Sequence, residues 1–211
     1  MKNYAFIDSQ NLNLAIQDLG WKLDFKKFRV FLKDKYKVTK AYLFIGHIAE
    51  NEAMYTSLKD SGYEIIYKPT LEKNGIVKGN CDAELVLNCM IEYKNFDKAV
   101  IVSGDGDFHC LIEYLDEKKK LLNIGIPSKR HYSSLLRKYT SSFFYVSDYK
   151  NKLRYTGSRT SKSDQGGKPA PEKGSKPETN IIVKKTFIHK KRIRKTHKKN
   201  GEHSFRHRHL G

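Results

Sequence analysis

The sequence predicts an α/β protein with three layers around a mainly parallel central sheet, followed by a disordered C-terminal tail. Short apolar runs alternate with segments of helical periodicity through residues 1–155. The apolar runs carry few polar positions, which is typical of strands that helices bury on both faces. The composition then changes sharply at Thr156, where residues with little apolar surface to bury begin.

Six apolar segments are predicted as strands, at residues 4–8, 40–46, 63–68, 98–103, 121–126 and 142–146. Helices are predicted between or after them, at residues 10–19, 24–36, 50–61, 81–93, 107–119 and 133–139. Asp24 and Glu50 are suitable residues for starting two of these helices, whereas Gly20 and Gly62 stand where helices are expected to stop. This alternation favours one parallel sheet over separate α and β domains.

Charge divides the chain into regions. The 211 residues have a formal net charge of +18. Residues 1–155 contain 25 basic and 19 acidic residues, whereas residues 156–211 contain 16 basic and 4 acidic residues. We therefore predict a folded domain at 1–155, a flexible Gly/Ser/Pro/Lys linker at 156–179 and a basic, His/Arg-rich tail at 180–211. A basic tail indicates a polyanionic partner, with nucleic acid favoured over a membrane surface.

The sequence predicts a cytoplasmic protein without a membrane partner. No apolar run approaches the roughly 20 residues that span a bilayer, and the N-terminus enters a strand without a charged-then-apolar leader. Cys81, Cys89 and Cys110 are odd in number and lack CxxC spacing, which argues against a disulfide framework or a zinc ribbon. Reduced thiols are then expected.

Acidic residues follow two of the predicted strands. Asp8 ends the first strand, and Asp105 and Asp107 stand in the turn Ser103-Gly104-Asp105-Gly106-Asp107 after the fourth. The carboxyl ends of parallel strands face one crevice, where open α/β sheets bind ligands. Carboxylates in one crevice repel one another unless a cation joins them. This pattern predicts a divalent-metal site.

Asp82 is a further candidate, in Lys78-Gly79-Asn80-Cys81-Asp82-Ala83-Glu84-Leu85 at the start of a predicted helix. A carboxylate on a first helical turn also serves as an N-cap, so for Asp82 and Asp105 taken singly a capping role stays open. Asp8 is different, because a carboxylate at the end of a buried strand needs a compensating partner. An EF-hand is excluded, since residues 105–107 lead directly into a helix. A dinucleotide-binding turn is excluded as well, because residues 9–11 contain no glycine.

Three segments in this order resemble the signature blocks of NYN domains, which belong to the PIN-like nuclease superfamily. They are Ile7-Asp8-Ser9-Gln10-Asn11-Leu12, the segment from Lys78 to Leu85, and Ser103-Gly104-Asp105-Gly106-Asp107-Phe108. The resemblance covers about residues 3–148 and does not extend to the tail. Ser9 is a departure, since many relatives carry glycine after the first aspartate.

The resemblance implies a Rossmann-like PIN fold whose acidic pocket holds Mg²⁺ or Mn²⁺ and cleaves RNA. The metal-binding and catalytic carboxylates would be Asp8, Asp82, Asp105 and Asp107. Asn11 would accompany the first aspartate and Ser103 would support the third block. Mg²⁺ prefers such hard oxygen ligands, and a metal-activated water requires no serine, cysteine or histidine nucleophile. His109 is the histidine nearest these motifs in sequence, and its place inside a predicted helix favours a packing or surface role.

Basic residues near the same edge suggest how RNA is held. Lys78 precedes the Asp82 helix, and Lys129 and Arg130 follow the fifth strand, where a solvated loop is the alternative. Contacts from such side chains to phosphates fix a strand without reading its sequence. The tail adds Lys190, Lys191, Arg192 and Arg194, which we expect to tether RNA. Lys118, Lys119 and Lys120 instead end a helix at the opposite edge, where a structural role is favoured.

Together these features predict a metal-dependent endoribonuclease that acts on single-stranded RNA, with a homodimer left open. A non-catalytic RNA-binding or scaffold protein on the same fold is the main alternative, because four carboxylates permit chemistry without requiring it. A toxin that needs an antitoxin is a weaker third interpretation, since the long tail is unlike a minimal toxin.

Overall fold

The computed structural model describes residues 1–68, 71–73, 76–78 and 82–157, and it gives 71–73 and 76–78 as strands only. Of the two units into which the chain divides, Met1–Pro171 and Glu172–Gly211, the fold described here belongs to the first. A six-stranded sheet has the order β3-β2-β1-β6-β7-β8, and all its neighbouring strands are parallel. The strands are β1 (Asn3–Asp8), β2 (Val38–Gly46), β3 (Glu64–Lys68), β6 (Lys98–Val102), β7 (Leu121–Ile126) and β8 (Phe143–Tyr145).

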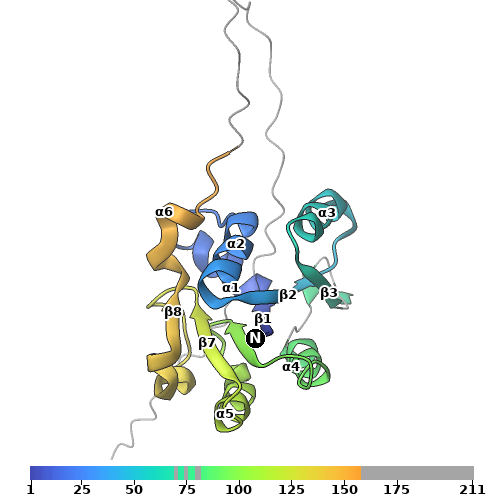
Figure 1. Cartoon of the computed structure of the whole chain (residues 1–211). Coiled ribbons are helices and arrows are strands. Elements are labelled where there is room, and N and C mark those ends of the chain that lie inside the picture. The colour runs from blue at the N-terminus through green and yellow to red at the C-terminus, as the bar shows by residue number, and fades with distance from the viewer. Residues whose placement is uncertain (69–70, 74–75, 79–81, 158–211) are drawn as a thin grey trace, which may run out of the picture. The chain divides into compact units, whose positions relative to one another are not determined.

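Helices cover both faces of this sheet, so the protein has three layers (Figure 1). The α-helices are α1 (Ser9–Gln17), α2 (Phe25–Tyr36), α3 (Glu52–Asp60), α4 (Asp82–Ile91), α5 (His109–Glu117) and α6 (Lys150–Leu153). The 3₁₀ segments are η1 (Ala49–Asn51), η2 (Gly106–Phe108), η3 (Ser134–Ser142) and η4 (Val146–Tyr149). This architecture confirms the predicted α/β class.

Each face of the sheet has its own hydrophobic core. On one face, α4 and α5 bury residues such as Leu85 and Ile112 against the side chains of Phe6 and Ile101. On the other face, residues from α1, α2, α3 and α6 pack against Ile7, Leu43 and Val102. Alternate residues of β1 therefore enter opposite cores, and the whole strand is buried. Such burial explains why these strands read as continuous apolar runs.

The observed elements lie close to the predicted ones, with three differences. A two-stranded antiparallel hairpin, β4 (Leu71–Lys73) with β5 (Ile76–Lys78), was not predicted. The segment predicted as a helix at 133–139 is the longer 3₁₀ segment η3, with non-helical backbone at Tyr139. The short helix α6 was also missed. Gly20 and Gly62 do follow helix ends, and both have positive φ, as helix-terminating glycines often do.

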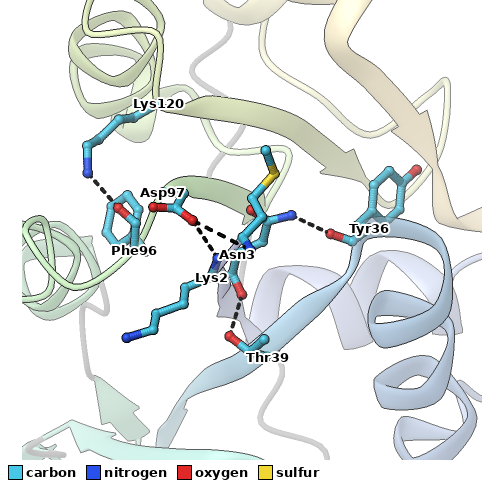
Figure 2. Close-up of polar contacts among 8 residues, drawn as sticks. Lys2, Asn3, Tyr36, Thr39, Phe96, Asp97 and Lys120 are labelled. Atoms are coloured by element: carbon cyan, nitrogen blue, oxygen red, sulfur yellow. Dashed lines mark hydrogen bonds and ion pairs between the residues drawn. The ribbon is translucent and has the colours of Figure 1, made fainter.

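At the amino edge of the sheet, where the parallel strands begin, polar side chains form hydrogen bonds with backbone groups (Figure 2). The Asp97 carboxylate accepts a 2.6 Å hydrogen bond from the Lys2 N–H, and the Asn3 amide donates to the Tyr36 carbonyl at 2.8 Å. Lys120 donates to the Phe96 carbonyl at 2.5 Å, as Figure 2 shows, and to the Tyr93 carbonyl at 2.7 Å. The sequence predicted a structural role for Lys118, Lys119 and Lys120, at the end of the helix expected at 107–119. These hydrogen bonds confirm that role for Lys120.

Two other expectations concern the thiols and the membrane. Cys89 is buried and Cys110 is exposed, and both are free thiols. Burial raises the pKa of the Cys89 thiol to about 12. Cys81 lies outside the described residues. Among the helices that the structure describes, none combines the length and apolar character needed to cross a bilayer.

Candidate functional site

The first and third acidic motifs lie at the same edge of the sheet because their strands are neighbours. β1 pairs in parallel with β6, with Ile7 opposite Val102. Asp8 is the last residue of β1, and the turn at residues 103–107 begins where β6 ends. Both motifs therefore stand at the carboxyl edge, as the parallel arrangement predicted.

Asp8 has a structural role in addition to its position at the carboxyl edge. Its side chain is the N-cap of α1 and accepts a 3.1 Å hydrogen bond from the Asn11 N–H. The residue is 5% exposed. The sequence left capping open for Asp82 and Asp105, yet Asp8 is itself a cap. A capping carboxylate can still use its second oxygen toward a ligand, so this duty is compatible with metal binding.

Asn11 joins the two motifs directly. Its side-chain oxygen accepts a 3.0 Å hydrogen bond from the Gly104 N–H, across ninety-three residues of sequence. Asn11 therefore holds the start of α1 against the turn that carries Asp105. This contact gives a physical role to the residue that was expected to accompany the first aspartate.

The turn after β6 is built from its own side chains. Ser103 is 1% exposed, and its hydroxyl accepts a hydrogen bond from the Asp105 N–H at 3.1 Å. Asp105 in turn accepts from the Asp107 N–H at 3.1 Å. Asp105 is half-buried, Asp107 is exposed, and neither forms an ion pair with a residue that the structure describes. The turn thus presents two carboxylates that have no cationic partner in the part of the chain that the structure describes.

Asp82 opens α4, which contacts both β1 and η2. The chain beyond this helix reaches Tyr93 and Phe96 at the amino edge, so its first turn lies toward the carboxyl edge. That turn contains a carboxylate that sequence reasoning missed. The Oε2 atom of Glu84 is buried and has no hydrogen-bond partner among the described residues. The position of Glu84, two residues after Asp82, was the feature of the sequence from which it could have been predicted.

A metal site at this edge stays a prediction. Among the residues described, no three or more His, Cys, Asp or Glu side chains form a group that could hold one ion. The structure places Asp8 and the Asp105 turn at the ends of neighbouring strands and links them through Asn11 and Gly104, and Asp82 opens α4, which contacts β1 and η2. The donor chemistry fits Mg²⁺ or Mn²⁺, which take carboxylate oxygens together with water.

The loop at residues 127–133, which follows β7, packs tightly on the Asp105 turn. The Ser133 N–H donates to the Gly104 carbonyl at 2.9 Å. A side chain at Gly104 would place its first carbon 2.2 Å from the His131 carbonyl oxygen, so only glycine fits there. Lys129 and Arg130 are exposed on this loop, and the Lys129 amine lies 5.5 Å from the centre of the Tyr145 ring.

Two further polar residues at this edge were not predicted. Lys68 ends β3, is 5% exposed, and donates to the side chain of Gln10 at 3.3 Å. The signal for it was the same as for Asp8, a charge at the end of an apolar strand. His131 is the second, and it lies beside Gly104 in space although it is remote in sequence. His109 is exposed and has a ring nitrogen 3.0 Å from the Gly106 carbonyl oxygen, which agrees with the predicted packing or surface role.

The remaining predicted RNA-binding residues cannot be placed as side chains. Lys78 is the last residue of β5, which is described only as a strand. The tail residues Lys190, Lys191, Arg192 and Arg194 lie outside the described part of the chain, as does nearly all of the predicted linker.

Comparison with known proteins agrees with the architecture. The chain is 25% identical over 162 residues to the low amplitude and bright protein LabA of Synechococcus elongatus, and the match covers 72% of this chain and 87% of that protein. A crystal structure of a protein of unknown function from Vibrio parahaemolyticus is similar in fold. Its TM-score is 0.59 at 22% identity, over 72% of this chain and 95% of the other.

A family model assigns the folded region. The model of the NYN domain matches residues 4–148, which include β1 through β8 and every aspartate considered above. This match confirms the family that the three sequence blocks resembled. The chain belongs to the NYN domain family, whose PIN-like domains have a nuclease-type fold.

Proposed function

We propose that this protein is a metal-dependent endoribonuclease whose site is formed by Asp8, Asp82, Asp105 and Asp107. The observation that supports it most is the hydrogen bond from the Gly104 N–H to Asn11, which ties the Asp8 motif to the Asp105 turn. A link of this kind fixes two carboxylate-bearing segments relative to each other. Fixed geometry is what a site needs if it is to bind an ion and a phosphate together.

The described residues fit a divalent cation by their chemistry. The four aspartates supply carboxylate oxygens, and Mg²⁺ or Mn²⁺ takes such ligands. The buried Oε2 atom of Glu84 is a further indication, since an unpartnered carboxylate oxygen is costly unless positive charge offsets it. Bound there, either ion would lower the pKa of a water molecule and offset charge on the phosphate in the transition state.

The chain's own residues would hold the site in shape. Asp8 is fixed at the start of α1, Ser103 fixes the amide of Asp105, and Asp105 fixes the amide of Asp107. Asp105 is half-buried and Asp107 is exposed, so both can be reached from solvent. They would receive the ion and water, while Asp8 supports them from the end of its strand.

RNA is the proposed substrate, with single-stranded RNA the form expected. Lys129 and Arg130 lie on the loop packed against the Asp105 turn, where they can contact phosphates. The basic tail at residues 180–211 would raise the local concentration of RNA.

A cytoplasmic location is part of this proposal, because the free thiols Cys89 and Cys110 suit a reducing compartment.

The test is a cleavage assay with labelled single-stranded RNA in Mg²⁺, Mn²⁺ or EDTA. We expect cleavage with metal and none with EDTA, and a loss of at least about a hundredfold in Asp105→Asn. Asp97→Asn at the amino edge is the matched control and should cleave normally. RNA binding without metal-dependent cleavage would favour the alternative, a non-catalytic RNA-binding protein. Normal cleavage by Asp105→Asn would show that the chemistry lies elsewhere.

The tail is tested separately by deleting residues 156–211. Affinity for RNA should fall and its salt dependence should flatten, because fewer phosphates are neutralised. The single-turnover rate at saturating RNA should change little, since the tail adds nothing to the transition state. Unchanged affinity and salt slope would contradict the tether.

A further inference from the structure

We propose that His131 is a phosphate-binding residue, whose Nε2–H donates a hydrogen bond to a backbone phosphate of RNA beside the cleavage site. This inference rests on the proposed function, since it takes RNA as the substrate. It adds a neutral donor to the charged Lys129 and Arg130 on the same loop.

His131 lies at the edge of the candidate site. Its backbone carbonyl packs against Gly104, between Ser103 and Asp105, and its imidazole lies between the side chains of Ser128 and Asp18. The loop that carries it is anchored at both ends. The Ser147 N–H donates to the Pro127 carbonyl at 3.0 Å, and the Ser133 N–H donates to the Gly104 carbonyl at 2.9 Å. A side chain on such a braced loop keeps its position when a ligand arrives.

Ser128 determines which ring nitrogen carries the proton. Its hydroxyl is buried, with the residue 4% exposed, and its oxygen lies 2.6 Å from His131 Nδ1. The same oxygen accepts a 3.3 Å hydrogen bond from the Arg130 N–H. Within the described part of the chain these are its two polar partners. The hydroxyl hydrogen therefore has Nδ1 as its acceptor, because otherwise it would be buried without one.

It follows that Nδ1 is unprotonated and that Nε2 carries the hydrogen when the ring is neutral. The outer nitrogen is then a donor at neutral pH, without any need for a charged imidazole. The side chain is 32% exposed, so a ligand can reach it. A buried serine that fixes a partly exposed histidine as a donor is an arrangement suited to binding an anion oxygen.

The group that faces Nε2 does not satisfy it. The carboxylate that pairs with it among the described residues is that of Asp18, whose Oδ2 is 3.9 Å away, which is too long for a hydrogen bond. Asp18 follows α1 and its side chain is 72% exposed, so it can turn away into water. A phosphate oxygen would take the position that Asp18 approaches. Removing the Asp18 charge should therefore improve binding, which a purely structural role for His131 does not predict.

The first experiment reads the tautomer directly. In ¹⁵N-labelled full-length protein, long-range ¹H–¹⁵N spectra distinguish a protonated Nε2 from a protonated Nδ1. We expect His131 as the Nε2–H tautomer, with its Nε2 signal shifting on addition of short single-stranded RNA in EDTA. Ser128→Ala should yield mixed tautomers. A protonated Nδ1 in the wild-type protein would overturn the inference.

The second experiment measures affinity for labelled single-stranded RNA in EDTA, where no cleavage occurs. His131→Ala should weaken binding about tenfold, the effect of one hydrogen bond to a charged acceptor. His131→Gln should restore much of this loss, because its amide keeps a donor at a similar reach. Asp18→Asn should tighten binding about threefold, whereas Asp60→Asn, the matched change at the end of α3, should not.

The outcomes separate the two proposals. Wild-type protein that binds RNA with an affinity unchanged in both His131→Ala and Asp18→Asn would overturn the role of His131 alone. Wild-type protein that fails to bind RNA would overturn the proposed function and this inference together. The expected pattern, with weakening by one variant and tightening by the other, supports a phosphate at Nε2.

Discussion

At the amino edge of the sheet, Asp97 and Lys120 are engaged with backbone groups of neighbouring segments. At the carboxyl edge, the hydrogen bonds given for Asp105 and Asp107 lie within the turn that carries them, and no described residue forms an ion pair with either. The two edges are made of similar residue types. At the amino edge, Asp97 and Lys120 use their charges to bind backbone groups. At the carboxyl edge, the carboxylates of Asp105 and Asp107 are left available for a ligand. Such imbalance marks the edge where a ligand is to be expected.

The largest expected effect tests how the carboxyl edge is braced. Gly104→Ala should destabilise the protein by about 3 kcal/mol, because its new methyl would meet the backbone of His131. Gly20→Ala is the control, where only the positive φ is strained and a loss of about 1 kcal/mol is expected. Urea unfolding measures both. Equal losses of unfolding free energy in the two variants would mean that the 127–133 loop shifts at little cost to accommodate the methyl group.

The next effect concerns metal and distinguishes the two edges most directly. Mn²⁺ at about a hundred times its Kd should stabilise the wild-type protein by about 2.7 kcal/mol. Asp105→Asn should lose this gain, and Asp97→Asn should keep it. Thermal unfolding with Mn²⁺ and with EDTA measures the difference. A gain lost equally in both variants would remove the distinction between the edges.

Lys120→Met should destabilise the amino edge of the sheet without changing the candidate site. We expect a loss of about 2 kcal/mol in the free energy of unfolding, because two carbonyls lose their charged donor. The cleavage rate at saturating RNA should be unchanged in protein that is still folded. A selective loss of cleavage would show that the amino edge also serves the site.

The smallest effect compares two aspartates in EDTA. Asp97→Asn should cost about 0.5 kcal/mol, since its contact with the chain start is more than half exposed. Asp105→Asn should be neutral or gain about 0.5 kcal/mol, because asparagine keeps the acceptor for Asp107 while charge repulsion falls. A clear destabilisation by Asp105→Asn would mean that this carboxylate is primarily structural.

Much of the fold was predictable because its strands are continuous apolar runs and its sheet is parallel. Residues 121–126 were predicted as a strand and are β7, and the convergence of Asp8 and Asp105 followed from the rule for parallel strands. The three-residue strands of the β4–β5 hairpin were missed, because segments so short and so rich in charge show no periodicity.

The site residues that stand in recognisable sequence motifs could be predicted, whereas those that loops bring together could not. Asp8, Asn11 and Asp105 stand in recognisable blocks, so their association could be inferred. His131 and Asp18 meet only because the loop after β7 folds over the end of α1. No periodicity or local spacing links residues of two loops, so only the structure reveals that pair.

The hydrogen bond between Asn11 and Gly104 crosses the point where the strand order reverses, with β1–β3 on one side and β6–β8 on the other. In the sheet the chain passes from one half to the other between β3 and β6, and after β8 it returns to the first half, where the Asp24 N–H donates to the Leu153 carbonyl. Divided between β3 and α4, the protein would give two fragments, each holding some of the aspartates. Under the proposed function, cleavage would return only when the fragments associate, and the domain would then serve as a split reporter of assembly.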